Sequence, residues 1–418
     1  MVVVKDLSHA QTILEKYIRP ATPGAYTLDL MRSLMAFLGN PQDSLKIIHV
    51  AGTSGKTSTS YYAAALLYEN GFKVGLSVSP HIDSVTERAQ INLQSLPEDK
   101  YCEELGIFLD LVDQSKLDPS YFEILVAFSY WLFERQRVDY AVIEVGLGGL
   151  LDGTNVINRK DKICIITDIG YDHTEILGKT LPEIAAQKAG IIYDNNSVFM
   201  HSQPKEVEDV IKNTSTIHHA QLHIIKAENE LSELSAFKDL PEFQQRNFSL
   251  AYSAVKELLP SPANIEGAIS VYIPARMEAV EWSGKTVIID GSHNKQKLRK
   301  LVEASEAKYH NRSIVLVVSF GQNKTASLEA NLETLRTISS HLIVTEFTLG
   351  QDEVRKAINA PDIASVAEKL GFSVMIETDP QKAFLLALRQ SEELVLVTGS
   401  FYLLNHIRPL MQLGERTR

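Results

Sequence analysis

A short glycine-containing loop carries the residue types that most directly suggest chemistry. Its glycines let the backbone curl until successive N–H groups point inward, while a lysine adds a mobile charge and a threonine a hydroxyl suited to Mg²⁺. Phosphate is the expected ligand, bound by Gly52, Thr53, Ser54, Gly55, Lys56, Thr57 and Ser58. Val50 stands where the common phosphate-loop pattern has its first glycine. A glycine turn with an accidental lysine is the alternative, which the order strand, loop, helix disfavours.

Two further segments bear side chains that could bind a metal or move a proton. Glu144 ends an apolar run, and its carboxylate is a hard oxygen ligand of the kind Mg²⁺ prefers. His173 follows Asp172 after the next apolar run, and its neutral imidazole could bind a metal or exchange a proton with an intermediate. Alone, Glu144 would be a solvated strand end and His173 a structural histidine. Their position beside the phosphate loop favours a shared site.

Three other charged residues are weak candidates on composition alone. Lys188 stands near a predicted helix end, where a lysine complements the helix dipole. Arg276 could offer planar donors to a phosphate and stabilise charge that develops during transfer. Asp290 follows another predicted strand and could face the same site as Arg276. Taken by themselves, all three are ordinary charged residues.

The hydrophobic pattern predicts the elements that would bring these residues together. Short apolar, β-branched runs predict strands at 46–50, 74–78, 140–145 and 163–167. Helical spacing predicts helices at 58–70, ended by Gly71, and at 181–189, with Thr180 as N-cap. This order indicates a parallel sheet with helices around it. Ligands collect at the carboxyl ends of such strands, where the phosphate loop and Glu144 would both emerge.

Past residue 260 a cluster of prolines interrupts the chain, and the alternation of strands and helices then restarts. Strands are predicted at 286–289, 314–319, 342–347, 372–376 and 394–398, and helices at 296–307 and 379–389. We therefore predict an α/β protein of two domains. Residues 1–275 form a P-loop ATPase domain with a parallel-rich central sheet and helices on both faces. Residues 276–418 form a smaller Rossmann-like domain.

Bulk composition excludes several classes of protein. A chain of 418 residues exceeds what one core usually organises, and 44% apolar with 22% charged residues is typical of a globular protein. The net charge of −11, with mixed signs along the chain, disfavours a nucleic-acid-binding surface. Cys102 and Cys164 are too few for a disulfide framework or a thiolate metal site. With neither a signal pattern nor a membrane-spanning run, we expect a cytoplasmic protein. A monomer is expected as well.

Several motifs in this order resemble those of one enzyme family. Ser79-Pro80-His81 and Glu87-Arg88 resemble its S-P-H and E-R motifs, and 144–149 followed by 151–155 continue the match. The most specific segment, 167–191, resembles T-x-I-G-x-D-H-x-x-x-L-G-x-T followed by I-A-x-x-K-A-G-I. In the second domain 290–294 is similar to D-G-A-H-N, and 397–403 to a terminal T-G-S strand. Together they resemble the folylpolyglutamate synthase and dihydrofolate synthase family, a branch related to the Mur ligases.

The resemblance implies roles for individual residues. Mg²⁺, one ion or two, would be bound by Thr57, Ser79, Glu144, His173 and Lys188. ATP would also contact Asn247, Arg276 and Asp290, and the folate-type substrate would contact Phe122, Asp152 and His293. Lys188 would carry a carbamate, which turns a cation into an anion suited to a second Mg²⁺. The family also suggests K⁺. The principal catalytic residues would be Lys56, His173, Lys188 and Arg276.

The resemblance also implies a reaction. ATP would phosphorylate a carboxylate to an acyl phosphate, which the α-amine of L-glutamate would attack to form an amide, with domain closure excluding water. The acceptor would be dihydropteroate, a folate already bearing glutamate, or both. Ser54, Thr57 and Leu150, which stands in place of the family's usual arginine, depart from the pattern. Thr57 favours one alternative, a Mur-type ligase acting on a peptidoglycan precursor. A second alternative is a P-loop ATPase that is not a ligase, which could use the same phosphate loop.

Overall fold

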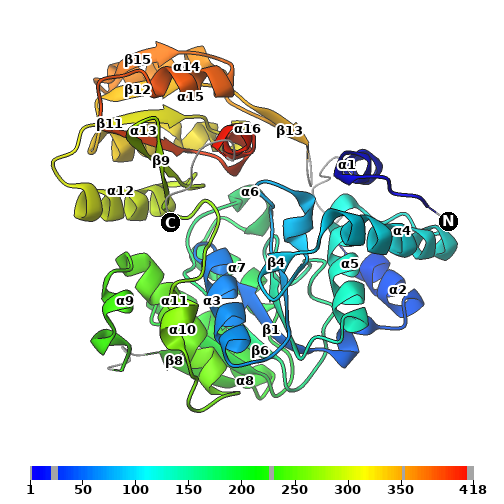
Figure 1. Ribbon diagram of the computed structural model, residues 1–418. Coiled ribbons are helices and arrows are strands. Elements are labelled where there is room, and N and C mark those ends of the chain that lie inside the picture. Colours follow the sequence, from blue (N-terminus) through cyan, green and yellow to red (C-terminus); the bar gives the residue numbers. More distant parts are fainter. Residues whose placement is uncertain (1, 20–26, 226–229, 351–353, 412–418) are drawn as a thin grey trace. The chain divides into compact units, whose positions relative to one another are not determined.

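The computed structural model describes residues 2–19, 27–225, 230–350 and 354–411. The chain divides into two compact units, Met1–Tyr272 and Ile273–Arg418 (Figure 1). The boundary predicted after residue 275 falls just inside the second of these units.

The first unit is built on a sheet of eight strands in the order β4-β3-β2-β5-β1-β6-β7-β8. The strands are β1 (Lys46–Ala51), β2 (Val74–Ser77), β3 (Gln90–Ile91), β4 (Gln94–Ser95), β5 (Tyr140–Glu144), β6 (Ile163–Ile166), β7 (Ser197–His201) and β8 (Gln221–Ile225). Only the short β3 and β4 pair antiparallel, which confirms the parallel-rich sheet. Because β2, β5, β1 and β6 run in one direction, their carboxyl ends lie at one edge.

Helices cover both faces of this sheet. The longer ones are α1 (Leu7–Glu15), α2 (Asp29–Phe37), α3 (Lys56–Glu69), α4 (Glu98–Ser115), α5 (Tyr121–Arg135), α7 (Leu181–Ala189), α8 (Lys205–Ile217) and α10 (Glu242–Lys256), and the shorter ones α6 (Thr174–Leu177), α9 (Ser235–Lys238) and α11 (Ile265–Ile269). The chain winds from β1 to β2 in one direction and from β6 to β8 in the other. Right-handed crossovers therefore place α3 on one face and α7 and α8 on the other. Helix α10 packs beside α3.

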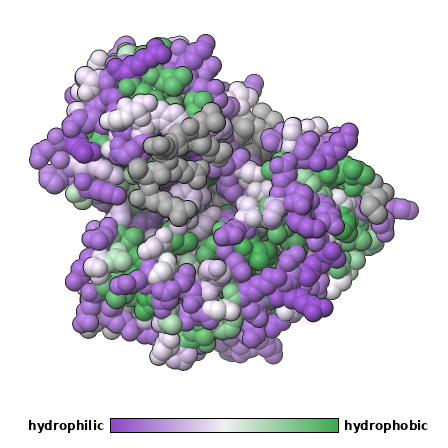
Figure 2. All heavy atoms as spheres, viewed as in Figure 1, coloured by the Kyte–Doolittle hydropathy of each residue, from purple (hydrophilic) through white to green (hydrophobic). Residues whose placement is uncertain are grey.

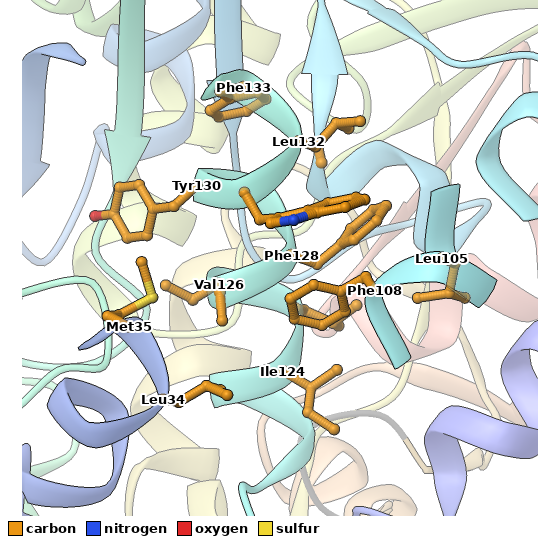
Figure 3. Close-up of a cluster of buried hydrophobic side chains, with 14 of the residues drawn as sticks. Leu34, Met35, Leu105, Phe108, Ile124, Val126, Phe128, Tyr130, Leu132 and Phe133 are labelled. Atoms are coloured by element: carbon orange, nitrogen blue, oxygen red, sulfur yellow. The ribbon is translucent and has the colours of Figure 1, made fainter. Parts of the chain in front are cut away.

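An aromatic cluster anchors α5 (Figure 3). The Phe128 ring lies 5.4 Å from the rings of both Tyr101 and Phe108 and stacks on Trp131 at 6.1 Å. Edge-to-face and offset pairs of this kind add stability beyond the area they bury. The first turn of the helix is fixed separately by a capping box between Ser120 and Glu123. Residues in that first turn are therefore held firmly in place.

The second unit has a six-stranded sheet in the order β15-β12-β11-β16-β10-β9. Its strands are β9 (Glu278–Trp282), β10 (Lys285–Ile289), β11 (Ile314–Val318), β12 (His341–Val344), β15 (Ser373–Ile376) and β16 (Leu394–Thr398), and β13 (Thr348–Gly350) pairs separately with β14 (Val354–Lys356). The helices are α12 (Lys295–Tyr309), α13 (Leu328–Arg336), α14 (Ala360–Lys369), α15 (Pro380–Ala387) and α16 (Phe401–Met411). Only the edge strand β9 is antiparallel in this sheet, as expected for a Rossmann-like domain.

The visible face of the molecule is mostly polar, with apolar residues interspersed (Figure 2). Within the described ranges, no helix is both long enough and apolar enough to cross a membrane.

Candidate active site

The predicted phosphate loop connects β1 to α3, and two of its glycines are required by their surroundings. Gly52 has φ of +152°, and a Cβ there would lie 1.8 Å from Thr167 Oγ1. Gly55 has φ of +94°, and a Cβ there would lie 2.3 Å from Asn247 Oδ1. L-residues rarely adopt these conformations, and neither site has room for a side chain. Asn247, predicted to contact ATP, thus packs directly against the loop.

The backbone of the loop is arranged differently from the expectation of successive inward-pointing N–H groups. The N–H groups of Thr53 and Ser54 both donate to the Asp168 carbonyl, at 2.9 and 3.1 Å. The Thr53 hydroxyl donates to the Gly170 carbonyl at 3.0 Å and accepts from its N–H at 3.1 Å. Because the first amides of a helix lack intrahelical partners, the start of α3 at 56–58 supplies the donors suited to phosphate. Gly55 has no side chain to cap them.

Thr57 and Glu144 meet at the carboxyl edge of the sheet. Thr57 Oγ1 donates to Glu144 Oε1 at 2.9 Å, and the Ser79 N–H approaches Glu144 Oε2 at 3.4 Å. Glu144 is only 3% exposed. The described residues contain no group of three or more His, Cys, Asp or Glu side chains that could hold a metal. A carboxylate with hydroxyl groups is nevertheless a hard oxygen set that fits Mg²⁺, which commonly completes its shell with water and substrate phosphate.

A pocket of unit 1 joins the predicted metal and substrate residues. Its wall includes Ser79, Glu144 and Phe122, which lies in the first turn of α5. Arg88 also lines the pocket and is 3% exposed. Its Nε donates to His81 Nδ1 at 3.1 Å, and burial together with the Arg88 charge holds the pKa of His81 well below its usual value. His81 is therefore a neutral acceptor that orients the guanidinium.

A salt bridge links the loop after β6 to α10. Arg246 Nε lies 2.9 Å from Asp168 Oδ1, and its Nη2 donates to the Ser202 carbonyl at 3.1 Å. Asp168 is thus held by its side chain, while its carbonyl holds Thr53 and Ser54. The pair also fixes the turn of α10 that presents Asn247, the next residue along the chain.

His173 lies at the same edge, on the segment between β6 and α6. Its φ is +49°, and it is the N-cap of α6. The ring nitrogens lie 3.9 Å from Asp172 Oδ1 and 3.8 Å from Glu175 Oε1, and the side chain is 27% exposed. Asp172 Oδ1 accepts from the backbone N–H of His173 at 3.1 Å, so the carboxylate contacts the backbone of this residue more closely than its ring.

Lys188 is buried against the phosphate loop rather than placed at an exposed helix end. The side chain donates from Nζ to the Gly52 carbonyl at 2.9 Å, and the residue is 3% exposed. The alternative of a lysine that merely complements the helix dipole does not explain this burial. Helix α7 therefore delivers an amine to the start of the loop.

Asp152 is buried and organises the segment that follows Glu144. Its carboxylate accepts from the Leu147 N–H at 2.7 Å and from the Thr154 N–H and hydroxyl at 3.0 and 2.6 Å. Burial raises the pKa of Asp152, while these hydrogen bonds oppose the rise. Asp152 thereby shapes the turn packed against Phe122, whose ring would lie 2.5 Å from a Cβ at Gly146.

The second unit gathers Arg276, Asp290 and His293 at the end of β10. The two Asp290 oxygens accept from the N–H groups of Met277 and Ser292, at 2.9 and 2.8 Å. The Arg276 guanidinium carbon lies 4.5 Å from the centroid of the Phe401 ring. Nδ1 of His293 lies 2.8 Å from the Gly291 carbonyl oxygen, and its Nε2 lies 3.1 Å from Lys297 Nζ. The three predicted residues therefore belong to one local cluster.

Comparisons with known proteins show the family of this chain. The family model of the Mur ligase middle domain matches residues 50–253, and that of the Mur ligase glutamate ligase domain matches 275–401. The dihydrofolate synthase/folylpolyglutamate synthase of Bacillus subtilis is 30% identical over 413 residues, covering 91% of this chain and 94% of the relative. This chain belongs to the folylpolyglutamate synthase and dihydrofolate synthase family of Mur ligases.

Other members of this family show similar coverage. The dihydrofolate synthetase of Saccharomyces cerevisiae is 28% identical, over 90% of this chain and 95% of the relative. A Mycobacterium tuberculosis folylpolyglutamate synthase structure, complexed with ADP, has a TM-score of 0.83 at 25% identity and covers 99% of both chains.

Leu150 marks this chain's departure from the arginine usual at that position of the family. The Leu150 N–H donates to the Gln187 carbonyl at 2.7 Å, and a Cβ at Gly190 would lie 2.5 Å from Leu150 Cα. The backbone of Leu150 thus holds the end of α7, while its side chain is 43% exposed. This substitution leaves an apolar side chain on the loop after Glu144.

Three residues of the candidate site received no role from the sequence. Two lie at the carboxyl edge of the first sheet and one lies in the cluster at the end of β10. Arg88 was matched to a motif but given no role, although the motif itself was the available signal. Asp168 and Phe401 also received no role, although both lie inside quoted motifs. Their contacts join segments far apart in the chain, which no local pattern reveals.

Proposed function

We propose that this chain is an ATP-dependent ligase that joins the α-amine of L-glutamate to the carboxylate of a folate-type acceptor. The observation that carries the proposal is the buried Glu144, which accepts a hydrogen bond from Thr57 of the phosphate loop and lines a pocket together with Phe122. The names of the relatives matched along the whole chain support folate as the acceptor over a peptidoglycan precursor.

The proposed reaction has two steps. An acceptor carboxylate oxygen attacks the γ-phosphorus of ATP, the bond to the β–γ bridging oxygen breaks, and ADP leaves. The glutamate amine then attacks the acyl carbon, the C–O bond to phosphate breaks, and the amine loses a proton. Lys56 and Arg276 stabilise the negative charge of the transferring phosphoryl group. His173, beside Asp172, is the group proposed to accept the proton or to bind metal.

Thr57, Ser79 and Glu144 are the residues that would hold Mg²⁺. When bound, the ion neutralises charge on the phosphate oxygens of ATP. The ADP complex of the M. tuberculosis relative supports nucleotide binding by this fold. Asn247 and Asp290 are proposed to line the nucleotide site, and Phe122, Asp152 and His293 the acceptor site.

Lys188 is proposed to carry a carbamate in the active enzyme. A carbamate keeps one N–H on Nζ, so it can retain the hydrogen bond to the Gly52 carbonyl while gaining a negative charge. Intact mass after incubation with bicarbonate tests this, with an increase equal to CO₂ that Lys188→Met lacks. An unchanged mass in active protein would reject the carbamate. K⁺ is proposed as a further cofactor, and activity unchanged after its exchange for Na⁺ would remove it.

The function itself is tested with purified protein, ATP, Mg²⁺ and L-glutamate, offered dihydropteroate or tetrahydrofolate in separate reactions. We expect ADP and a new amide product in equal amounts with at least one acceptor. If neither ADP nor an amide product forms with either acceptor, the proposed function is wrong. ADP formed at the same rate without any acceptor would instead favour an ATPase that is not a ligase.

A further inference from the structure

Arg276 lies on a turn whose backbone is in a sparsely populated conformation. Ala275 and Met277, on either side of it, each have φ of +52°. Residues other than glycine remain in this region only where the surrounding structure fixes them, and such residues gather at functional sites. The starting point of the Arg276 side chain is therefore held firmly.

Three hydrogen bonds hold this turn in place. The Met277 N–H donates to Asp290 Oδ2 at 2.9 Å, and the Ala275 N–H donates to Glu278 Oε2 at 3.0 Å. On the other side, the Gly291 N–H donates to the Ala275 carbonyl at 3.2 Å. These bonds tie the turn to the end of β10 and to the start of β9.

The Arg276 side chain is oriented by an aromatic ring. Its guanidinium carbon lies 4.5 Å from the centroid of Phe401, and its Nη1 donates to the Ala275 carbonyl at 3.1 Å. A planar guanidinium is attracted to the face of such a ring. The Phe401 ring contains no oxygen or nitrogen atom, so its contact with the guanidinium forms no conventional hydrogen bond with these N–H donors. The ring can thus fix the group without competing with an anion.

The Phe401 ring is itself confined. A Cβ at Gly291 would lie 1.9 Å from Phe401 Cε1, so only glycine leaves room for the ring. The His293 ring meets it at a centroid distance of 5.9 Å and an angle of 65°. Phe401 begins α16, which is anchored by the buried Leu403 and Leu404. The Arg276 guanidinium consequently lies over a ring whose position is fixed by its neighbours.

We propose that Phe401 is a positioning residue that orients Arg276 toward an anion, namely the phosphate groups of ATP. The proposal rests on the function proposed above for the choice of anion. Without the ring, the long arginine side chain would sample several rotamers, and ordering it upon binding would cost free energy. Phe401 therefore acts only through Arg276.

The test is a cycle of four proteins: wild type, Phe401→Leu, Arg276→Ala and the double variant. We expect Phe401→Leu to lower kcat/KM for ATP about ten-fold in the wild-type background and to have no further effect once Arg276 is alanine. Phe401→Tyr, which keeps the ring, should retain near-wild-type activity. If Phe401→Leu does not fold, Phe401→Met replaces it.

The same cycle is measured by calorimetric binding of a non-hydrolysable ATP analogue with Mg²⁺, which needs no acceptor turnover. Coupled effects on binding in a protein that forms no amide would reject the proposed function but keep this inference. Trp282→Leu, which removes another aromatic ring of the same unit, should leave both readouts unchanged. An equal effect of Phe401→Leu in both backgrounds, or none in either, would overturn the proposal.

Discussion

In the first unit several candidate residues directly follow the ends of parallel strands. In the second unit the position of Arg276 depends on carboxylate side chains that accept hydrogen bonds from the turn around it. Glu144 ends β5, whose pairing with β1 sets Glu144 opposite Val50 two residues before the phosphate loop. Arg276 instead lies between two residues with left-handed φ, fixed by Asp290 and Glu278. The sheet brings the first set together at one edge and polar contacts then orient it, while the second set depends mainly on polar contacts to a turn.

This difference predicts how each region responds to substitution. In the first unit the strands hold the backbone whether or not the functional side chain is present, so a substitution there can remove activity and leave stability unchanged. Where a carboxylate both holds a strained turn and belongs to the site, activity and stability should fall together. Four sets of variants separate these cases.

The largest effect is expected from Glu144→Gln. The amide still offers an acceptor to Thr57, so the fold should be retained, but the negative charge suited to Mg²⁺ is lost. We expect kcat to fall about 100-fold or more, with Tm changed little. Glu134→Gln, on the exposed surface of α5, is the matched control and should behave as wild type. Activity retained in Glu144→Gln would show that this carboxylate does not serve the site.

The next largest effect is expected from Gly55→Ala, with Gly71→Ala as its matched control. Both glycines have positive φ, +94° and +85°, but an added Cβ meets Asn247 at 2.3 Å only in the first case. Gly71→Ala should cost about 1 kcal/mol of unfolding free energy and leave ATP binding unchanged. Gly55→Ala should cost about 1–3 kcal/mol more and weaken ATP binding about ten-fold or more. Equal ATP affinity in both variants would contradict the placement of the nucleotide at this loop.

The sequence was sufficient to predict strands β1, β2, β5 and β6 and helices α3 and α7 of the first region, but not helices α5 and α10, which carry Phe122 and Asn247. Strands β1, β5 and β6 are buried on both faces over most of their length, so each is a mainly apolar run, and the end of each run locates a site residue. Strand β8 lies at the sheet edge, half-buried and partly polar, and was not predicted. The antiparallel β9 was missed because its exposed positions alternate with buried ones over only a few residues.

The local chemistry of the second region could not be predicted in the same way. The contact between Arg276 and Phe401 joins residues more than a hundred positions apart, and it exists only because Gly291 leaves space for the ring. The amide contacts of Asp290 depend on a backbone conformation that no composition indicates. Family resemblance named Arg276 and Asp290, but not the contacts that hold them.

Asp290→Asn tests the coupling expected of the second region. One carboxylate oxygen becomes an NH₂ group that faces either the Met277 or the Ser292 N–H, leaving a buried donor without an acceptor. This should cost about 1–3 kcal/mol in urea unfolding of this unit, together with a loss of ATP affinity. Asp362→Asn, an exposed residue of α14, should change stability by less than about 0.5 kcal/mol. Lost affinity with unchanged stability would instead indicate that Asp290 acts only by contacting ATP.

The smallest expected effect is a pH dependence of the unfolding free energy of the first unit, caused by Lys162. Its Nζ is buried, donates to the Ile157 and Ile191 carbonyls at 3.1 and 2.7 Å, and lies 4.3 Å from the Tyr193 ring centroid. Burial lowers the pKa of Lys162 to about 8. Below pH 8 the buried Lys162 is charged in the folded state, and its destabilising effect is largest. Between this pH and the unfolded pKa of about 10.4 the folded state binds fewer protons than the unfolded state, so the free energy of unfolding should rise with pH.

Lys162→Met isolates this contribution, because other groups that titrate at high pH are shared by both proteins. The difference in unfolding free energy, wild type minus variant, should rise by about 1 kcal/mol between pH 8 and pH 9. Urea unfolding at each pH, followed separately for the transition of each unit, measures it. The transition of the second unit should show no such difference. A pH-independent difference would mean that Lys162 is charged to the same extent in both states, and that its carbonyl contacts fully offset its burial.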